Sequence, residues 1–241
     1  MSETKPFIIF VEGNIATGKS TFLSLIAKHL KNVQAIHEPV DKWTQLKDSD
    51  NVNILDYFYK DMEKYTYSFQ SFAFLSRVML LDEIDKSKDI VFIERSIFSD
   101  REIFAKNCVK NGTMKEIEWN LYTKWFDWML KRLDLSEGEN FLHLYLKCPA
   151  DECYRRLKER NRDEEQNVSQ EYLQEIHDRH EEWLGNKKCI VVDASQNFRD
   201  NTKCLKNIIS EIDKQLPFLC LFQLHKKMLD HDPLLPPTEL V

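Results

Sequence analysis

The chain has 241 residues, of which 42% are apolar and 31% charged, and its formal net charge is −6 at pH 7. This length suits one domain or at most two, and the composition excludes collagen-like, glycine-rich and disordered chains. The acidic balance argues against a nucleic-acid polymer as the main partner. No apolar run has the length of a membrane-spanning helix, and the N-terminus has neither an apolar signal core nor an arginine before Arg77. We therefore expect no membrane contact and a cytoplasmic location, with the nucleus left open.

Five short runs of β-branched and apolar residues, separated by longer stretches, organise the chain. Their continuous apolarity is typical of strands buried on both faces of a parallel sheet. No proline occurs between Val40 and Cys148, which permits long helices there. The alternation of strands and helices predicts an α/β fold with a five-stranded parallel sheet flanked by helices. The predicted strands are Phe7–Val11, Val33–Ile36, Ile90–Ile93, Phe141–Leu146 and Cys189–Val192.

The C-terminal residues differ from the rest of the chain. From Pro217 to Val241 the sequence consists of short apolar runs followed by Pro233, Pro236 and Pro237. We expect one folded domain over residues 1–216 and an irregular tail over 217–241, whose role the sequence does not indicate.

The first predicted strand leads directly into a glycine-containing loop. Gly13 and Gly18 bracket a match to G-x-x-x-x-G-K-[ST], and an amphipathic helix follows. In this strand–loop–helix context, free backbone N–H groups and the helix dipole bind phosphate. Lys19 is expected to reach the β- and γ-phosphates and Ser20 to ligate Mg²⁺. The predicted phosphate-binding residues of this P-loop are Gly13, Asn14, Ile15, Ala16, Thr17, Gly18, Lys19, Ser20 and Thr21.

The P-loop indicates a nucleoside triphosphate but leaves the acceptor of the phosphate open. GTP-binding proteins read guanine with an N-K-x-D motif, whereas the only Asn-Lys pair here, Asn186-Lys187, lacks the aspartate. Motors and helicases need a longer chain. A small-molecule kinase fits the length, and it needs a base near the acceptor hydroxyl, a carboxylate for the metal and cations over the phosphates.

Three further segments carry such groups. Glu38 follows the second predicted strand and Glu94-Arg95-Ser96 follows the third, so both lie at the sheet edge where open α/β folds bind ligands. A helix is expected after the fourth strand, and its Arg156 and Arg160 share a face and can converge on one anion. Each segment alone has a plain structural explanation, such as a turn cap, a surface ion pair or a solvated face; together, after a P-loop, they favour a kinase. The arginines expected on this helix are Arg155, Arg156, Arg160 and Arg162.

A fourth segment lies within a long predicted helix. Gln70, Ala73 and Arg77 share one helix face in strongly apolar surroundings. If buried, Gln70 suits the edge of a nucleobase, because it has a donor and an acceptor side by side. A buried Arg77 needs an anion, for which Asp100 is a candidate. The alternative is that Gln70 and Arg77 face solvent on an amphipathic helix.

With these motifs the chain resembles the deoxyribonucleoside kinase family, in particular deoxycytidine and deoxyguanosine kinases. The resemblance extends from about Lys5 to Leu216 and implies a P-loop kinase fold with a lid at about residues 155–168. The matching pieces are Glu12–Ala16 with Gly18–Ser20, Glu38–Val40 with Trp43, Ser68–Gln70, Leu75–Arg77, Glu94–Ser96 with Ser99–Arg101, and Arg162–Gln166.

The resemblance implies phosphoryl transfer from ATP or UTP, with Mg²⁺, to the 5′-hydroxyl of a deoxynucleoside. Glu38 would be the general base, Arg95 would hold it, and Lys19 would act on the phosphates. Ser20 and Glu94 would position Mg²⁺. The resemblance also suggests a homodimer formed through long helices. The lid arginines over the donor phosphates would be Arg156, Arg160 and Arg162.

The resemblance further implies how the two nucleosides would be bound. Aromatic and apolar side chains would wall the pocket for the acceptor base, Gln70 would read the base edge, and Tyr59 and Glu165 would bind the sugar 3′-hydroxyl. The implied nucleoside-binding residues are Glu38, Trp43, Leu55, Phe58, Tyr59, Phe69, Gln70, Ala73, Arg77, Arg95, Asp100, Phe104 and Glu165. Those near the donor's base would be Gln196, Asn197 and Phe198.

The pair Arg77 and Asp100 bears on the choice of base. A charged pair crowds the 5-methyl group of thymine and offers donors and acceptors to an amino-bearing base, so we expect deoxycytidine and deoxypurines to be preferred over thymidine.

Two alternative functions remain open from the sequence: a nucleoside monophosphate kinase similar to thymidylate kinase, and a non-catalytic nucleotide-binding module. The sequence does not rank the three preferred nucleosides or fix the donor.

Overall fold

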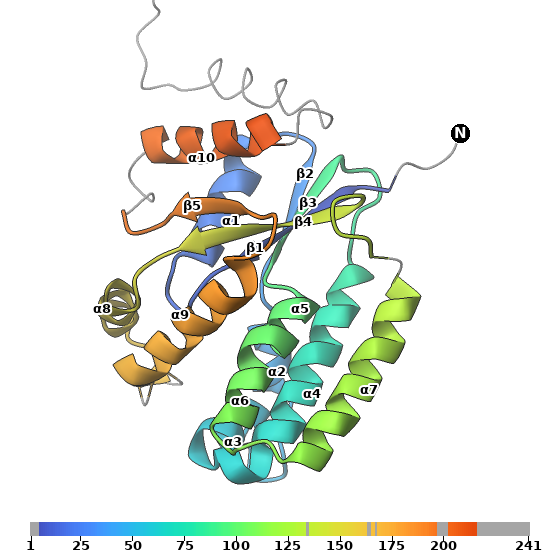
Figure 1. The fold of residues 1–241 in the computed structure, drawn as a ribbon, viewed down its shortest axis with the longest axis vertical. Helices are drawn as coiled ribbons and strands as arrows, with labels where there is room; N and C mark the ends of the chain where they lie inside the picture. Colours follow the sequence, from blue (N-terminus) through green and yellow to red (C-terminus); the bar gives the residue numbers. More distant parts are fainter. Residues whose placement is uncertain (1–4, 134, 163–164, 167, 197–201, 216–241) are drawn as a thin grey trace, which may run out of the picture.

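The computed structural model describes residues 5–133, 135–162, 165–166, 168–196 and 202–215, and its centre is a five-stranded parallel sheet (Figure 1). The strand order is β2-β3-β1-β4-β5, and each neighbouring pair is parallel. The predicted fold and all five predicted strands are confirmed. The last strand lies one residue later than predicted, because Asp193 pairs with Lys147 while Cys189 precedes the ladder. The strands are Phe7–Glu12 (β1), Val33–Ile36 (β2), Ile90–Glu94 (β3), Phe141–Lys147 (β4) and Ile190–Asp193 (β5).

Helices cover both faces of the sheet, as continuous apolar strands require. Side chains alternate along β1, so Ile9 and Val11 face the layer of α1 (Lys19–His29) and α10 (Thr202–Gln215). Ile8 and Phe10 face the opposite layer, to which Leu80 of α4 (Met62–Leu81) belongs. On this second face α9 (Gln170–Leu184) packs beside Tyr145 of β4.

A helical half extends from the carboxyl edge of the sheet and fills the lower part of Figure 1. It contains α2 (Val40–Gln45), α3 (Ile54–Lys60), α4 and α7 (Glu116–Leu133). The proline-free stretch permits long helices, and α4 and α7 are the long helices that form there. Its core is aromatic, and the stacked pair Phe58 and Phe69 has ring centroids 4.6 Å apart.

The segment after β3 is helical but irregular. A short α5 (Ile97–Ser99) leads into a π-helical stretch, η1 (Asp100–Ala105), and then into α6 (Lys106–Lys110). Such π-helical stretches are rare and frequently occur at functional sites.

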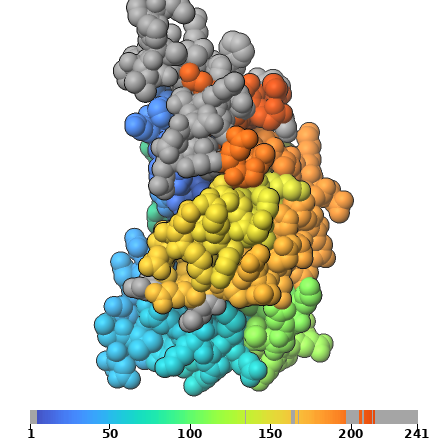
Figure 2. Space-filling view, turned by 90° about the vertical axis from the view of Figure 1, so that its left-hand side faces the viewer, coloured from blue at the N-terminus to red at the C-terminus, as the bar shows by residue number. Residues whose placement is uncertain are grey.

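Helix α8 (Ala150–Arg160) follows β4 and lies on the outer surface. Figure 2 shows this side of the molecule, with the segment around α8 in its middle and α3 and the start of α4 below it. Within the described ranges, no helix is both long and apolar enough to cross a bilayer.

Candidate active site

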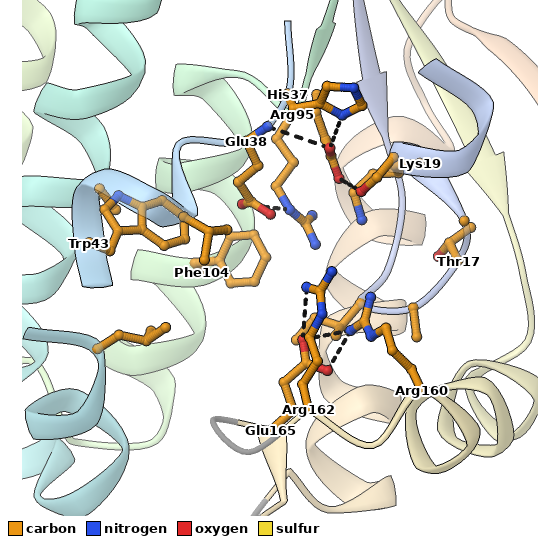
Figure 3. Close-up of a pocket in the computed structure, with 18 of the residues that line it drawn as sticks. Thr17, Lys19, His37, Glu38, Trp43, Arg95, Phe104, Arg160, Arg162 and Glu165 are labelled. Atoms are coloured by element: carbon orange, nitrogen blue, oxygen red, sulfur yellow. Dashed lines mark hydrogen bonds and ion pairs between the residues drawn. The ribbon is translucent and has the colours of Figure 1, made fainter. Parts of the chain in front are cut away.

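A cavity of about 1030 Å³ lies between the P-loop and the helical half (Figure 3). Its walls come from the carboxyl ends of β2 and β3, from α1, α3, α4 and η1, and from the end of α8. All thirteen side chains assigned to the nucleoside by the resemblance line this cavity. Elements far apart in the sequence thus bring these residues to one site, at the carboxyl ends of the strands where the sequence predicts ligand binding.

The P-loop is shaped by its own hydrogen bonds. Gly13, Ala16 and Gly18 adopt φ angles of 149°, 60° and 106°, in the left-handed region. The Asn14 side chain joins the loop to α9, because its Nδ2 donates to the carbonyl of Leu173 at 2.8 Å and its Oδ1 accepts from the N–H of Ile15 at 2.8 Å. Gly13 and Asn14 do not line the cavity; in this structure they fix the loop that does.

Lys19 is buried at the base of the loop. Its Nζ donates to the carbonyl oxygens of Gly13 at 3.2 Å and Asn14 at 2.8 Å, so the ammonium group is held in place by the backbone. Burial, helped by the nearby Arg95 guanidinium, lowers the pKa of Lys19 to about 8, although Glu94 and Glu38 oppose this shift. The cation is therefore destabilised until an anion approaches it.

Ser20 and Glu94 meet beside the P-loop. Ser20 Oγ donates to Glu94 Oε1 at 2.9 Å, and His37 Nδ1 lies 3.5 Å from Glu94 Oε2. Burial acts to raise the pKa of Glu94, but His37, Lys19, Ser20 and Arg95 together lower it to about 2. An ionised carboxylate and a hydroxyl are oxygen ligands of the kind that Mg²⁺ prefers. Across the described residues, no three His, Cys, Asp or Glu side chains gather to form a metal cage.

Glu38 is held by two buried arginines from different elements. Its Oε1 accepts a hydrogen bond of 2.5 Å from Arg77 Nη2 and lies 3.2 Å from Arg95 Nε. Figure 3 shows Glu38 and Arg95 side by side in its upper part, joined by a dashed line. Burial acts to raise the pKa of Glu38, but the two guanidinium groups outweigh it, and the net pKa is lowered. The carboxylate is thus ionised and able to accept a proton.

Arg77 is fully enclosed and makes the contact expected of it. Its Nε donates to Asp100 Oδ1 at 2.7 Å, which confirms the expected pairing of these residues and excludes the alternative of a solvent-facing arginine. Gln70 is likewise buried, at 2% exposure. The second contact of Arg77, with Glu38, is not predicted from the sequence.

The wall opposite the P-loop is aromatic. Phe69 stacks on Phe58 and meets the ring of Trp43 edge to face, with centroids 5.4 Å apart. Trp43 is fixed in turn, because its Nε1 donates to Ser76 Oγ at 2.8 Å. The Arg95 guanidinium lies over the ring of Phe104 at 4.7 Å. Flat rings held in this way offer a slot for a planar ligand.

The lid arginines lie along the other side of the cavity. Arg156 Nη1 donates to the carbonyl of Thr17 at 3.0 Å and its Nη2 to that of Ser195 at 2.7 Å, so it joins the P-loop to the chain after β5. Arg160 Nη2 donates to Glu165 at 2.5 Å. The expectation that Arg162 belongs to the same helix is wrong, because α8 ends at Arg160 and Asn161 adopts a left-handed φ of 50°.

Other predicted and unpredicted residues complete the site. Gln196 lines the cavity as expected for the donor side, whereas Asn197 and Phe198 lie outside the described residues. Sequence reasoning missed His37, although its position next to Glu38 at a strand end could have indicated it. It also missed Tyr172, which comes from α9, a helix without a recognisable motif.

Comparisons with known proteins agree with this geometry. A family model described as deoxynucleoside kinase matches residues 9–217. Deoxycytidine kinase 2 of Gallus gallus is 32% identical over 234 residues, which cover 85% of this chain and 88% of that protein. Deoxycytidine kinase of Bos taurus is 34% identical over 194 residues, covering 73% and 74%. Mitochondrial thymidine kinase 2 of Homo sapiens is 37% identical over 182 residues, covering 75% and 65%.

The backbone of Gly13 gives a first prediction. A Cβ atom there would lie 2.7 Å from the backbone carbonyl oxygen of Leu146. Gly13→Ala should therefore lower the free energy of unfolding by about 2–6 kcal/mol, the sum of overpacking and left-handed strain. Gly112→Ala is the matched control, since its φ is also positive but no atom lies within 4 Å of the added Cβ; it should cost about 1–2 kcal/mol. Equal losses in urea unfolding would contradict the clash.

The environment of Lys19 gives a second prediction. Because phosphates stabilise its charged form, triphosphate binding near pH 8 should take up about half a proton, and affinity should fall as the pH rises through 8. Calorimetry of ATP binding in two buffers with different ionisation enthalpies measures the uptake. Lys19→Arg is the control, because an arginine does not deprotonate. The same uptake in this variant would show that another group takes the proton.

Proposed function

The chain belongs to the deoxynucleoside kinase family, and on that premise we propose that it transfers the γ-phosphoryl group of ATP to the 5′-hydroxyl of deoxycytidine and deoxypurine nucleosides in preference to thymidine. The observation that carries the proposal is the chain of contacts Asp100–Arg77–Glu38–Arg95. These contacts bring a carboxylate and a charged pair into one cavity, which supports a role for the first on the hydroxyl and for the second on the nucleobase.

Glu38 supplies the general base of this reaction. Both arginines contact its Oε1. Its Oε2 would therefore accept the proton of the substrate hydroxyl. As the 5′-oxygen bonds to the γ-phosphorus, its proton passes to Glu38 and the bond to the leaving ADP oxygen breaks. Lys19 and the lid arginines offset the charge on the phosphates, since phosphoryl transfer depends mainly on positioning and charge stabilisation.

Mg²⁺ belongs to the same proposal. Ser20 Oγ and the Glu94 carboxylate would hold it, and their hard oxygen atoms beside the P-loop fit the ion. Bound there, the ion would shield the charge of the donor's phosphates.

The base preference rests on Arg77 and Asp100. Burial raises the pKa of Asp100 to about 6, and Arg77 offsets part of this cost, so both groups are charged at neutral pH. Together with Gln70 they present donors and acceptors at the end of the aromatic slot. A monophosphate acceptor would need a cation here that is not already paired with a carboxylate. Arg77 is paired with two carboxylates, Glu38 and Asp100.

A homodimer is the proposed assembly, with a second copy covering one face of α7. The exposed side of this helix carries an apolar stripe, in which Ile117 is 74% and Trp125 55% exposed. Trp125 and Trp128 contact each other with ring centroids 6.1 Å apart, and Leu75 and Met79 of α4 are also exposed. Figure 1 shows α7 on the outer flank of the helical half, beside α4. A self-complementary stripe of this kind suits a two-fold interface.

A panel of radiolabelled phosphate transfer from ATP to the four deoxynucleosides and dCMP tests the function. We expect transfer to deoxycytidine or a deoxypurine nucleoside to exceed transfer to thymidine, and none to dCMP. Glu38→Gln is the control and should lose about 10²–10⁴-fold in kcat with nucleoside binding kept. Turnover of Glu38→Gln close to that of the unaltered chain would show that Glu38 is not the general base. Hydrolysis of ATP that does not depend on a nucleoside would refute the kinase function.

The double variant Arg77→Met with Asp100→Ala tests the base preference. Removing the charged pair makes room for the 5-methyl group, so kcat/KM for thymidine should rise relative to that for deoxycytidine. Asp100→Asn is the matched control, since it removes the charge and keeps the bulk. An unchanged ratio in the double variant would show that the pair does not select the base.

The apolar stripe predicts the behaviour of surface variants. Trp125→Glu with Trp128→Glu should convert the dimer to a monomer in analytical ultracentrifugation, because charges would be buried between the copies. Val191→Glu is the control, since Val191 is an equally exposed apolar residue on β5, at the far edge of the sheet. A monomer for the unaltered chain, or a dimer for the tryptophan variant, would contradict the interface.

A further inference from the structure

A group of buried polar residues lies behind the cavity and does not line it. Glu12 is the last residue of β1 and immediately precedes Gly13, and its exposure is 0%. His143 of β4 is also at 0%, and Phe10 of β1 is its partner in the ladder. A carboxylate without contact with water needs a compensating charge or hydrogen bonds, and this one is not used by the reaction.

Glu12 is tied to the turn that carries the catalytic groups. Its Oε1 accepts a hydrogen bond of 2.5 Å from Ser96 Oγ. Ser96 caps α5 through reciprocal hydrogen bonds with Ser99, of 3.1 and 3.0 Å. The side chain of Glu12 thus holds the start of the helical segment that follows β3.

The same two loops are joined on the other side by Arg95. Its φ of 61° is left-handed, its backbone N–H donates to the carbonyl of Val11 at 2.9 Å, and its Nη1 donates to that of Gly13 at 2.8 Å. Residues 11 to 13 and residues 95 and 96 are therefore clamped together by three contacts. Two of them involve Arg95, and the third is the Glu12–Ser96 hydrogen bond.

His143 is the basic side chain beside the Glu12 carboxylate. Its Nδ1 lies 3.6 Å from Glu12 Oε1, and its Nε2 lies 3.9 Å from Glu137 Oε1. Among the described residues, both ring nitrogens and Glu12 Oε2 are without a hydrogen-bond partner. Four aromatic side chains also lie against the ring, with ring centroids 4.9 to 5.8 Å away: Phe10, Phe98, Phe141 and Trp183.

Both ring nitrogens of His143 face carboxylates, Glu12 at Nδ1 and Glu137 at Nε2. Lys187 bonds Glu137 at 3.1 Å, and Arg95 acts on Glu12 from the side of the turn. Burial acts to raise the pKa of Glu12, but His143, Ser96 and Arg95 outweigh it and lower the net pKa.

We propose that His143 is a positioning residue: as the basic side chain beside the buried Glu12 carboxylate it stabilises this carboxylate, which holds Ser96 and so fixes Glu94 and Arg95 against the P-loop. The proposal concerns the active site described above and rests on the proposed kinase function. It implies that losing the histidine harms the enzyme because it strands a buried charge, and that neutralising this charge restores the enzyme.

A double-mutant cycle with His143→Phe and Glu12→Gln tests this pairing. Phenylalanine fills the aromatic surroundings but leaves the carboxylate alone, so His143→Phe should lose about 10²-fold in kcat, the effect of a misplaced catalytic group. The KM for the nucleoside should change by no more than about threefold, because the cavity walls are untouched. Glu12→Gln with His143→Phe should recover most of the lost kcat, since neither member then carries a charge.

The cycle has clear contrary outcomes. If the two substitutions reduce kcat independently, so that the double variant is the worst of the three, the pair does not exist. If His143→Phe fails to fold, the double variant decides: recovery of soluble folded protein supports the pair, and equal insolubility overturns it.

His180 provides the matched control. It is also a fully buried histidine, but its Nδ1 meets the carbonyl of Ile176 at 2.7 Å, and burial lowers its pKa to about 3, which makes it neutral. Glu12 acts on His180 only as one of several charges, so the coupling between His180→Phe and Glu12→Gln should be weaker than that between His143→Phe and Glu12→Gln. Coupling as strong as that of His143 would overturn a specific pairing.

A urea-unfolding cycle on the same variants needs no substrate and separates this proposal from the function. The urea midpoint of unfolding should be lower for His143→Phe than for the unaltered chain, and adding Glu12→Gln should raise it again. Coupling in this cycle without nucleoside turnover by the unaltered chain would refute the proposed function alone. Turnover without coupling would refute the pairing alone.

Discussion

The contact of one carboxylate with two buried arginines is the constraint on which the site depends. Glu38 follows β2, Arg77 belongs to α4 and Arg95 follows β3, so the three side chains come from three separate elements. Each cation is almost completely enclosed, and a buried cation is tolerated only where carboxylates stand beside it. The helical half therefore docks on the sheet with a fixed geometry, because a displacement of either part would leave a guanidinium group without its counter-ion.

The phosphate side of the cavity is built differently, from backbone geometry rather than from ion pairs. Left-handed φ angles at Gly13, Ala16 and Gly18 turn the loop around a space, and the Lys19 ammonium is held by backbone carbonyl oxygens. The low pKa of Lys19 shows that this arrangement leaves the cation short of negative charge. A loop of this kind is organised before its ligand binds, and bound phosphates would supply the negative charge that Lys19 lacks in the protein alone.

The sequence predicts the fold well because the fold depends on local patterns. Continuous apolar runs locate all five strands, and the P-loop match locates a loop whose conformation needs two glycines. Arg162 is predicted on the helix but lies outside α8, because Asn161 adopts a left-handed φ, which helical periodicity does not reveal. The single-residue offset of β5 has a similar origin, since the ladder with β4 sets its register and local apolarity does not.

The candidate site is predictable where a residue follows a strand and much less so where packing decides. Glu38 and Glu94 follow from their positions at strand ends. The contact between Arg77 and Glu38 does not, because it depends on how α4 crosses the end of β2, and neither segment encodes that crossing by itself. Tyr172 and the pair Glu12–His143 belong to the same class, since each depends on how distant elements pack together.

Base recognition and phosphoryl transfer are linked through Arg77 in the proposed function. One edge of its guanidinium group bonds Asp100 in the π-helical segment, and another bonds the Glu38 carboxylate that would take the proton. A nucleobase that displaces the arginine by even a small distance therefore changes the charge next to the general base. Arg95 also contacts Glu38, and it lies on the P-loop side of the cavity. The position of the Glu38 carboxylate would therefore depend on both substrates. On this proposal, selectivity would arise in kcat as well as in binding, since a base that fits poorly would also leave Glu38 poorly placed.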